Sequence, residues 1–248
     1  SSEGFGYGWE KFDDRFELVK GNVNNIDDVK AAIKDCTGVH CSIAGDAELA
    51  AVQQVIAAAE GMKLERITYI SGCTAVEANR WFPLIETKLK AETALQKSGI
   101  PYTIFAPTWP MEMLVRYARN GQPTLIGKQT RSYHFFSVVD LARMVSTAYR
   151  SKAAVNKRFV IHGPEAIPFD EALLRYCKVF HPEVEKVSKL PLWLAKLIAL
   201  LTKNELMRFG AELSGYFDKV GELGDPDEAN AVLGTPSITL DEWMASRS

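Results

Sequence analysis

Four groups of residues could do chemistry in this sequence, and each group follows a short apolar run. Ser71, Cys73 and Thr74 stand in SGCTA after RITYI, and any of these side chains could form a hydrogen bond to a substrate oxygen. Small residues end the run GVHCSIAG, where they would let a ligand approach the backbone closely. The other two groups are the pair Asn22 and Val23 and the trio Pro107, Thr108 and Trp109.

The cysteines form no pattern that binds a metal. The sequence has four cysteines, Cys36, Cys41, Cys73 and Cys177. They form no C-x-x-C pair, and no histidine stands beside them at a metal-ligand spacing. Unpaired cysteines usually pack as small apolar side chains. We therefore expect reduced, structural thiols in a cytoplasmic protein, and no metal site.

The charge and hydropathy of the chain argue against two classes of partner. Lysine and arginine number 29 and aspartate and glutamate 31, and the resulting net charge of −2 gives no global attraction for nucleic acid or an anionic membrane. A local basic patch is still compatible with this net charge. The longest apolar run, Leu190 to Leu201, contains Lys196 and is shorter than the ~20 residues that cross a bilayer. We expect a small-molecule ligand, no nucleic acid and no membrane, with a homo-oligomer left open.

Strands and helices that alternate along the first half of the chain must position these groups. Apolar runs predict strands at FELVK, GVHCSIA, RITYI and PYTIFAP, with helices in the segments between them. This alternation is typical of a parallel sheet with right-handed crossovers. Because each crossover returns the chain to the same side, one edge of the sheet should hold Asn22, Ala44, Gly45, Ser71, Lys88 and Thr108.

Beyond Gly163 the pattern is mostly helical. One long apolar helix is predicted over PLWLAKLIALLTKNELMRFGAELSGYF. Asp140 is expected to cap the start of a helix, and His134, beside two phenylalanines, is expected to be packed rather than catalytic. The predicted division is a core of residues 1–110, completed by residues 135–163, and a substrate-side lid of residues 111–134 and 164–248.

Five segments, taken in order, resemble the atypical short-chain dehydrogenase/reductase family, close to its NmrA-like group. They are GNVNNIDDVKAAIKDCTGVHCSIAG, ITYISGCTA, TKLKAETALQKSGIPYTIFAPTWPMEML, HFFSVVDLARMV and DPDEANAVLGTPSITLDEWM. The resemblance covers nearly the whole chain. It implies an α/β, Rossmann-like parallel sheet with helices on both faces, and a mostly helical C-terminal part that binds substrate. It also implies NADP or NAD across the carboxyl ends of the strands.

The resemblance assigns the cofactor contacts residue by residue. Asn22 and Val23 match the positions near the adenine, with an asparagine where the family has an aspartate. A turn after a strand explains Asn22 equally well. The nicotinamide carboxamide would meet the backbone of Pro107, Thr108 and Trp109. The remaining implied contacts come from Ile43, Ala44, Gly45, Ser71 and Lys88.

The catalytic pair of that family is incomplete in this chain. Short-chain dehydrogenases use Tyr-x-x-x-Lys, in which the lysine lowers the pKa of the tyrosine so that the phenol can pass a proton. The resemblance sets Lys88 as the lysine, and Leu84, which cannot transfer a proton, stands four residues earlier. Lys88, Cys73 and Thr74 are the candidate catalytic residues. The alternatives are a solvent-exposed helix lysine at this position and Lys90 as the matching residue.

The glycine-rich turn that opens the family's fold is not found in this sequence. GFGYG, at residues 4–8, has no apolar strand before it and no helix start after it, and we predict a loop. The strand predicted at Phe16 to Lys20 would lack its usual neighbour. Either the chain is truncated, or this strand lies beside GVHCSIAG. Because that turn binds the pyrophosphate, we expect this chain to bind NAD(P) weakly or not at all.

Three functions fit these features. The first is an NAD(P)-dependent oxidoreductase-like protein, in which Leu84 would make dehydrogenase chemistry poor. The second is a regulatory protein that binds a dinucleotide without turning it over. The third is a structural or assembly subunit that kept the fold and lost the site. The apolar faces of the predicted lid favour an uncharged or partly apolar ligand.

Overall fold

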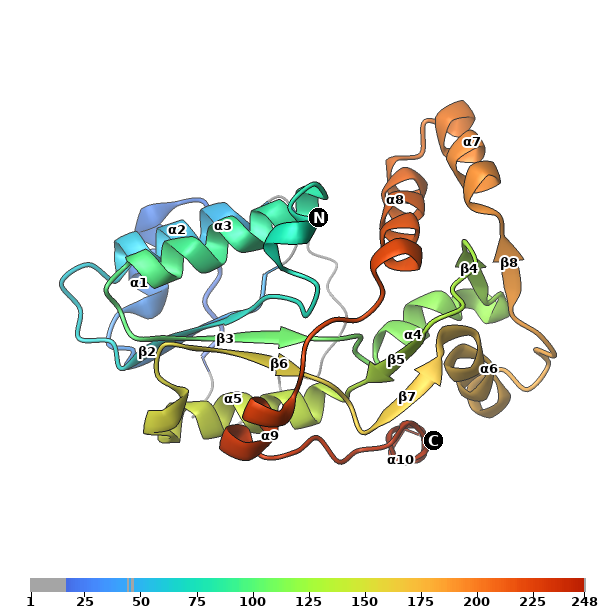
Figure 1. Ribbon diagram of the computed structural model, residues 1–248. Helices are drawn as coiled ribbons and strands as arrows, with labels where there is room; N and C mark the ends of the chain where they lie inside the picture. The colour runs from blue at the N-terminus through green and yellow to red at the C-terminus, as the bar shows by residue number, and fades with distance from the viewer. Residues whose placement is uncertain (1–16, 44, 46, 248) are drawn as a thin grey trace.

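The centre of the molecule is a four-stranded parallel sheet with the strand order β1-β2-β3-β6 (Figure 1). The computed structural model describes residues 17–43, 45 and 47–247. The four strands are β1 (Gly38–Cys41), β2 (Arg66–Ile70), β3 (Tyr102–Pro107) and β6 (Lys157–Ile161). Ile67 of β2 and Ile104 of β3 are fully buried, because helices cover both faces of the sheet. The predicted α/β class with a parallel sheet is confirmed.

Helices pack on each face of this sheet (Figure 1). One face carries α1 (Ile26–Ile33), α2 (Glu48–Ala58) and α3 (Pro83–Lys97). The other face carries α5 (Val138–Arg150) and α9 (Asp227–Leu233). Amphipathic spacing explains the packing of α1, since Val29 and Ile33 turn inward, and Asn25 caps its first turn by accepting from the backbone N–H of Asp27.

A second group of elements extends from the carboxyl edge of the sheet. It contains two small sheets, in which β5 (Ser132–Phe135) pairs antiparallel with β7 (Glu165–Pro168) and β4 (Thr124–Ile126) pairs parallel with β8 (Ser188–Leu190). Its helices include α4 (Met113–Tyr117), α6 (Phe169–Phe180) and α10 (Leu240–Ala245). Short 3₁₀ turns lie at Glu77–Asn79, Arg119–Gly121 and Lys152–Ala154. The core of this second group of elements contains Tyr133, Phe135, Phe169 and Trp243.

The strand predicted at Phe16 to Lys20 is wrong for the residues that the structure describes. Residues 17–20 have no regular secondary structure, and Leu18 is 74% exposed. In the described chain β1 pairs with β2 alone, so this apolar run has no backbone partner to hold it extended. Phe16 itself and the loop predicted at residues 4–8 lie outside the described residues.

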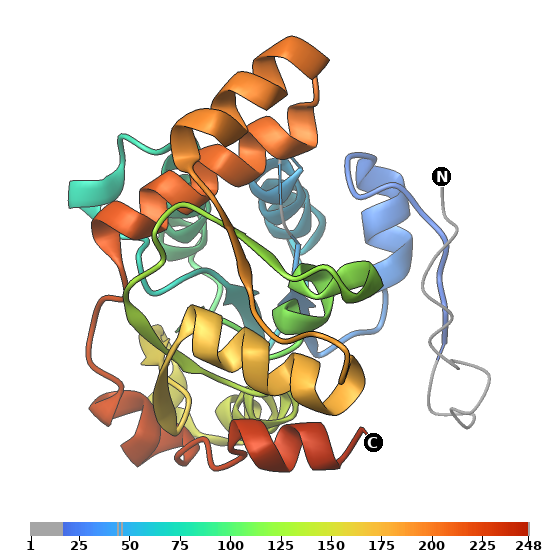
Figure 2. The same ribbon diagram turned by 90° about the vertical axis from the view of Figure 1, so that its right-hand side faces the viewer.

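The long apolar helix predicted near the C-terminus is two helices. They are α7 (Leu192–Thr202) and α8 (Glu205–Val220), which lie side by side and stand away from the sheet (Figures 1 and 2). The chain breaks at Lys203, whose φ of +52° is left-handed, and restarts at Asn204, whose side chain accepts from the backbone N–H of Met207 at 3.0 Å. None of the helices in the described part of the chain is both long and apolar enough to cross a bilayer.

The prediction that Asp140 caps a helix is also wrong. Ser137 is the N-cap of α5 and accepts from the backbone N–H of Val139 at 3.2 Å. Asp140 lies in the first turn, is 3% exposed, and accepts from the backbone N–H groups of Ser237 and Ile238, both at 2.9 Å. Its carboxylate therefore joins α5 to the C-terminal segment rather than closing its own helix.

Candidate functional site

A cavity of about 730 Å³ opens at the carboxyl ends of β2 and β3. The residues that line it from these strand ends are Ser71, Gly72, Cys73, Thr74, Pro107, Thr108 and Trp109. Helices α3, α5 and α8 complete the wall with mainly apolar side chains, which include Leu84, Leu141, Val145, Leu213 and Phe217. Apolar walls with a few converging polar groups are typical of small-molecule sites. The structure therefore brings Ser71, Lys88 and Thr108 together around one cavity, at the edge of the sheet where they were predicted.

Lys88 lies on the cavity wall and forms an ion pair with a buried carboxylate. Its Nζ lies 2.7 Å from Oε1 of Glu48, which is fully buried at the start of α2, and the Lys88 side chain is 14% exposed. The phenol of Tyr69 donates to the same Oε1 at 2.5 Å. Burial and the neighbouring Glu48 raise the pKa of Tyr69. Only one N–H of the ammonium is directed to Glu48, so the other two can donate to a ligand.

Lys90, the alternative lysine on the same helix, differs from Lys88 in its exposure and in its ion-pair partner. It is 52% exposed and pairs with Glu86, one turn earlier, at 3.0 Å. This exposed pair is the solvated arrangement that a helix lysine usually has. Leu84 and Lys88 both line the cavity, so an apolar side chain stands on its wall one turn before the lysine.

Two phenols from other parts of the chain line the cavity instead. Tyr216 of α8 stacks on Phe82, with ring centroids 4.4 Å apart, and its hydroxyl donates to the carbonyl oxygen of Thr74 at 3.4 Å. Tyr133 of β5 donates to the carbonyl oxygen of Phe217 at 3.4 Å, and burial raises its pKa to about 12. Both phenols are committed to backbone carbonyls and remain protonated at neutral pH.

The loop that follows β2 is held from behind by a buried polar network. Ser71 donates to Oε1 of Glu92 at 2.5 Å, and Arg158 forms an ion pair with Oε2 of Glu92 at 3.0 Å. Arg158 also donates to the carbonyl oxygens of Gly72 and Ala75 at 3.1 and 3.0 Å. The hydroxyl proton of Ser71 is therefore directed to Glu92, and the network fixes the loop that carries Cys73 and Thr74.

Cys73 lies in this loop with its thiol buried. Burial, the largest cause, raises the pKa of Cys73 to about 11. A thiol with this pKa stays protonated near neutral pH and can donate a hydrogen bond, but it is a poor nucleophile. Thr74 beside it is 4% exposed, and its carbonyl oxygen accepts from the side-chain amide of Asn79 at 3.0 Å.

The segment after β3 is held by hydrogen bonds to its neighbours and contains one buried donor. The hydroxyl of Thr108 donates to the carbonyl oxygen of His134, and the carbonyl oxygen of Pro107 accepts from the backbone N–H of Cys73 at 3.0 Å. The indole N–H of Trp109 is buried without a hydrogen-bond partner among the described residues. A buried donor of this kind is costly unless a ligand or water accepts from it.

The residues predicted near the adenine do not line this cavity in the part of the chain that is described. Asn22 accepts from the backbone N–H of Asn24 through its side chain at 3.0 Å, the geometry of a turn, while Val23 packs against the core below α1. Ile43 and Gly45 follow β1 without lining the cavity, where His40 and Ser42 do so instead. Ala44 lies outside the described residues.

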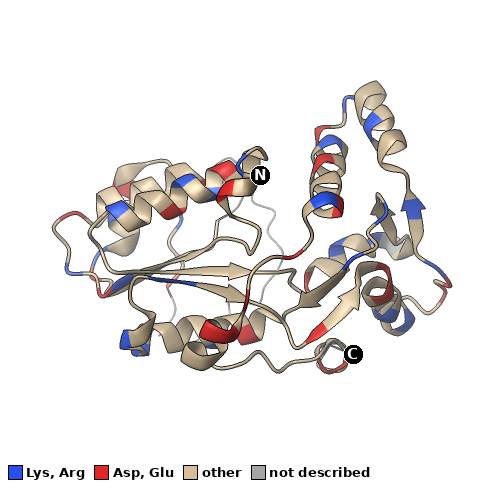
Figure 3. Cartoon of the chain, viewed as in Figure 1, with Lys and Arg blue, Asp and Glu red and all other residues tan. Residues whose placement is uncertain are grey.

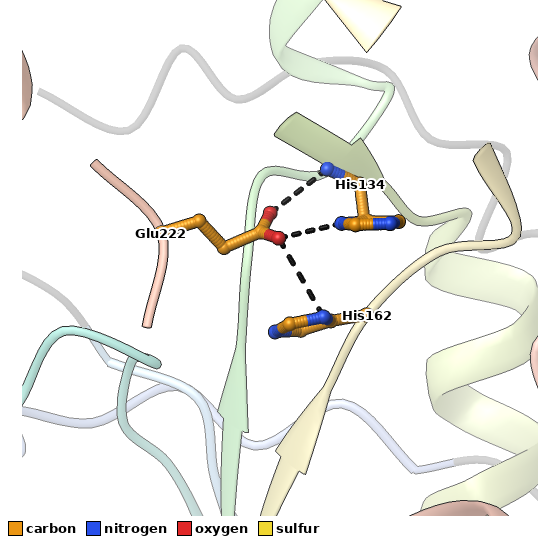
Figure 4. Close-up of side chains that lie close together, drawn as sticks. All are labelled: His134, His162 and Glu222. Atoms are coloured by element: carbon orange, nitrogen blue, oxygen red, sulfur yellow. Dashed lines mark hydrogen bonds and ion pairs between the residues drawn. The ribbon is translucent and has the colours of Figure 1, made fainter. Parts of the chain in front are cut away.

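A cluster of His134, Glu222 and His162 lies beside the cavity (Figure 4). Glu222, in the segment after α8, accepts from Nδ1 of His134 at 2.5 Å and from its backbone N–H at 2.8 Å, and lies 3.5 Å from Nδ1 of His162. The two rings are stacked, with centroids 5.0 Å apart and planes 17° apart. Both Nδ1 atoms lie near the same Oε1 of Glu222, so this carboxylate occupies the point on which the two rings converge. The cluster therefore joins the segment after α8 to β5 and β6.

Sequence reasoning missed several residues of this site. Glu48, Glu222, His162 and Tyr216 acquire their roles from partners far away in the chain, such as Lys88, which is 40 residues from Glu48. His134 is packed against a ring, as expected, but it also forms hydrogen bonds. No local pattern in the sequence marks these residues.

The residues present fit the nicotinamide half of a dinucleotide. Among the described residues the ammonium of Lys88 forms one hydrogen bond, to Glu48, which leaves two donors for a ligand. Gly72 leaves the backbone open, since a Cβ built there would meet only the Lys88 side chain, at 3.9 Å. A flat ring could approach the backbone at this point.

The parallel sheet and the cavity at its carboxyl edge define a Rossmann-like α/β protein with a site of the nucleotide-binding type. A family described as NAD(P)H-binding matches residues 10–149, more than half of the chain, and this protein belongs to that family.

Individual relatives are distant. The chain is 24% identical over 195 residues to a photosystem II assembly factor, Ycf39, of Trieres chinensis, a match that covers 74% of this chain and 61% of the relative. It is 25% identical over 139 residues to agroclavine dehydrogenase of Claviceps fusiformis, covering 53% of this chain and 47% of that protein. The chain thus spans between about half and three fifths of the length of these curated relatives.

Solved structures show the same fold. An NADPH-dependent quinone oxidoreductase of Escherichia coli, crystallised with NADPH, superposes with a TM-score of 0.70. The two chains are 18% identical, and the match covers 92% of this chain and 82% of the other. At this identity the comparison supports the fold, and the chemistry has to be argued from the site.

Proposed function

We propose that the cavity holds the nicotinamide half of NADPH or NADH beside a partly apolar small molecule, and that the protein is a reductase for that molecule. The observation that carries this proposal is the placement of Lys88. A buried carboxylate holds its ammonium at the cavity wall, one helical turn after the apolar Leu84. A lysine kept only for solubility would resemble Lys90, exposed and paired on its own helix.

The bound dinucleotide would supply a hydride, and the chain's own residues would bind and protonate. Lys88 would donate to the hydroxyls of the nicotinamide ribose through its two unused N–H groups. Pro107, Thr108 and Trp109, which line the cavity, would meet the carboxamide through their backbone. Gly72 would leave room for the ring.

Proton transfer to the substrate would differ from that in a typical short-chain dehydrogenase. No phenol stands at residue 84, so the proton would come from Lys88 itself, from the protonated thiol of Cys73 or from Thr74. A substrate that accepts a hydride without strong acid assistance suits this arrangement best. The names of two similar proteins, an NADPH-dependent quinone oxidoreductase and a dehydrogenase, support a redox use of the cavity.

Residues 111–134 and 164–248 would form the lid that supplies the substrate side of the cavity. Leu213, Tyr216 and Phe217 of α8 and Glu222 line the wall that faces the strand ends. Because these side chains are mostly apolar, they would favour an uncharged, partly apolar substrate. Residues 1–110 with residues 135–163 would form the core that binds the cofactor.

A dinucleotide-binding protein without turnover is the second candidate. Leu84 favours it, and one relative is named as an assembly factor. The two candidates share the binding site and differ only in whether a hydride leaves the bound cofactor.

NADPH and NADH oxidation with a panel of quinones and partly apolar carbonyl compounds tests the proposal. Removing Lys88 alone would leave Glu48 buried without its cation, so the informative variant is the double substitution Lys88→Met with Glu48→Gln. Its matched control is Lys90→Met with Glu86→Gln. We expect turnover that falls at least about tenfold in the first variant and is unchanged in the control. Dinucleotide binding without oxidation of any compound would instead establish the second candidate.

A further inference from the structure

Helix α7 is built with its small residues inside and its large apolar residues outside. Ala195 and Ala199 are buried where α7 packs on α8. The outward side chains are Trp193, Leu197, Leu200 and Leu201, which are 67%, 43%, 74% and 74% exposed. A helix that faces water on one side normally shows the reverse arrangement. The outer face of α7 is therefore made for a surface that excludes water.

The apolar face continues around the end of the helix pair. Leu206 and Phe209, in the first turns of α8, are 76% and 45% exposed. Leu206, Phe209 and the outward residues of α7 are not among the residues that line the cavity, which α8 reaches with Leu213, Tyr216 and Phe217. The face and the cavity are separate features of the molecule.

Lysines are the charged residues of α7 and of the segment just before it, between Glu185 and Glu205. Residues 186–204 contain four lysines and no aspartate or glutamate (Figure 3). A hollow of about 1030 Å³ beside Trp193 is lined by Lys128, Lys189, Lys196 and Lys219, with Asp218 as its one carboxylate. Asp218 already accepts from the backbone N–H groups of Lys128 and Gln129, at 2.9 and 2.7 Å. Lys189 already pairs with Asp170 at 2.7 Å and Lys219 lies 4.5 Å from the centroid of the Trp81 ring, so the lysines that the described contacts leave for an anion are Lys128 and Lys196.

We propose that the outer face of α7 docks on the surface of a membrane that contains anionic lipid. Leu197, Leu200 and Leu201 would enter the boundary between headgroups and acyl chains, and Trp193 would lie at the interface. Lys196 and Lys203 would contact the anionic headgroups. The net charge of −2 does not oppose this contact, because it is summed over the whole chain, while the charge near α7 is locally positive. With eleven residues, α7 would lie on the membrane rather than span it.

Co-sedimentation with vesicles tests the proposal. The intact chain should bind vesicles of phosphatidylcholine that contain phosphatidylglycerol, and should bind vesicles of phosphatidylcholine alone much more weakly. Leu200→Glu with Leu201→Glu should reduce binding at least about tenfold, because two charges replace the apolar contact. Lys196→Gln with Lys203→Gln should reduce it about fivefold for each lysine and weaken its dependence on salt. Val179→Glu is the control, since it places a charge at an exposed apolar position on α6, outside the α7 face.

Circular dichroism and thermal unfolding of each variant would show that the fold is retained. Equal binding by the Leu200/Leu201 variant and the Val179 variant would overturn the proposal, as would the absence of binding to anionic vesicles. The rival occupant is a second copy of this chain. Light scattering tests this alternative. If the intact chain is a dimer, the Leu200/Leu201 variant is a monomer and no vesicle binding is found, then the face mediates self-association and not membrane binding.

Discussion

At the scale of single residues, Lys88 and Glu48 form an ion pair that water barely reaches. Glu48 is fully buried and Lys88 is 14% exposed. Glu48→Gln would leave an ammonium with little solvent and no counter-charge, and we predict a loss of about 2–4 kcal/mol in the free energy of unfolding. Glu86→Gln, in the exposed pair with Lys90, should cost less than about 1 kcal/mol. Urea denaturation measures both, and equal losses would show that burial does not strengthen the first pair.

Cysteine reactivity provides a second test at this scale. Burial raises the pKa of Cys73 to about 11, whereas Cys36 is exposed. Iodoacetamide at pH 8 should therefore alkylate Cys36 and leave Cys73 unmodified in the folded protein, as read by mass spectrometry of peptides. Rapid alkylation of Cys73 at that pH would show that the thiolate forms readily and could act as a nucleophile.

The same thiol makes stability depend on pH in the alkaline range. Its folded-state pKa of about 11 lies above the ordinary value of 9.0, so the folded protein binds the proton more tightly than the unfolded chain. This contribution is complete well below pH 9 and is lost as the pH rises through 9 towards 11, by about 1.4 kcal/mol at pH 10. Cys73→Ala should flatten the decline in unfolding free energy over that interval, and an unchanged slope would contradict the assignment.

At the scale of elements, two polar residues near the start of α5 have different roles. Ser137 caps the helix, and Asp140 links it to the C-terminal segment. Ser137→Ala removes the N-cap and should cost about 1 kcal/mol. Asp140→Ala leaves two backbone N–H groups without acceptors, at about 1–3 kcal/mol each, so it should be the more damaging change. Hydrogen exchange at Ser237 and Ile238 should accelerate in the Asp140 variant alone. Acceleration in both variants would mean that the C-terminal segment depends on α5 in some other way.

The alternation of strands and helices could be predicted, because local periodicity specifies it. The spacing in α1, α2 and α3 and the apolar runs of β2 and β3 are properties of neighbouring residues. The break between α7 and α8 was missed because apolar residues continue on both sides of Lys203 and Asn204, although an asparagine before a glutamate is a helix-start signal. Strand β8 has only three residues, too few for a period to show.

The candidate site could be predicted only in part, for a related reason. Lys88, Leu84 and the SGCTA loop follow from spacing within one segment and from a family resemblance. Glu48, Glu222 and His162 gain their roles from contacts across many residues of sequence, since Glu222 lies 88 residues from His134. Such pairings depend on how the chain folds back, which local pattern does not encode.

At the scale of the whole molecule, the cavity and the outer face of α7 are separate. The cavity lies between the strand ends, α5 and the inner side of α8, whereas Leu200 and Leu201 lie on the far side of the helix pair. We therefore predict that Leu200→Glu with Leu201→Glu leaves dinucleotide affinity unchanged. Calorimetry on this variant checks the point, and a large loss of affinity would mean that the two surfaces are coupled.

The central claim is that Lys88 makes this cavity a dinucleotide site, and calorimetric titration with NADPH and NADH tests it most directly. The titration has to reach millimolar concentrations of dinucleotide, because we expect the binding to be weak. The account predicts that the intact chain binds one dinucleotide, that Lys88→Met with Glu48→Gln weakens binding at least about tenfold, and that Lys90→Met with Glu86→Gln does not. Equal affinities for the two double variants, or no binding by the intact chain, would contradict it.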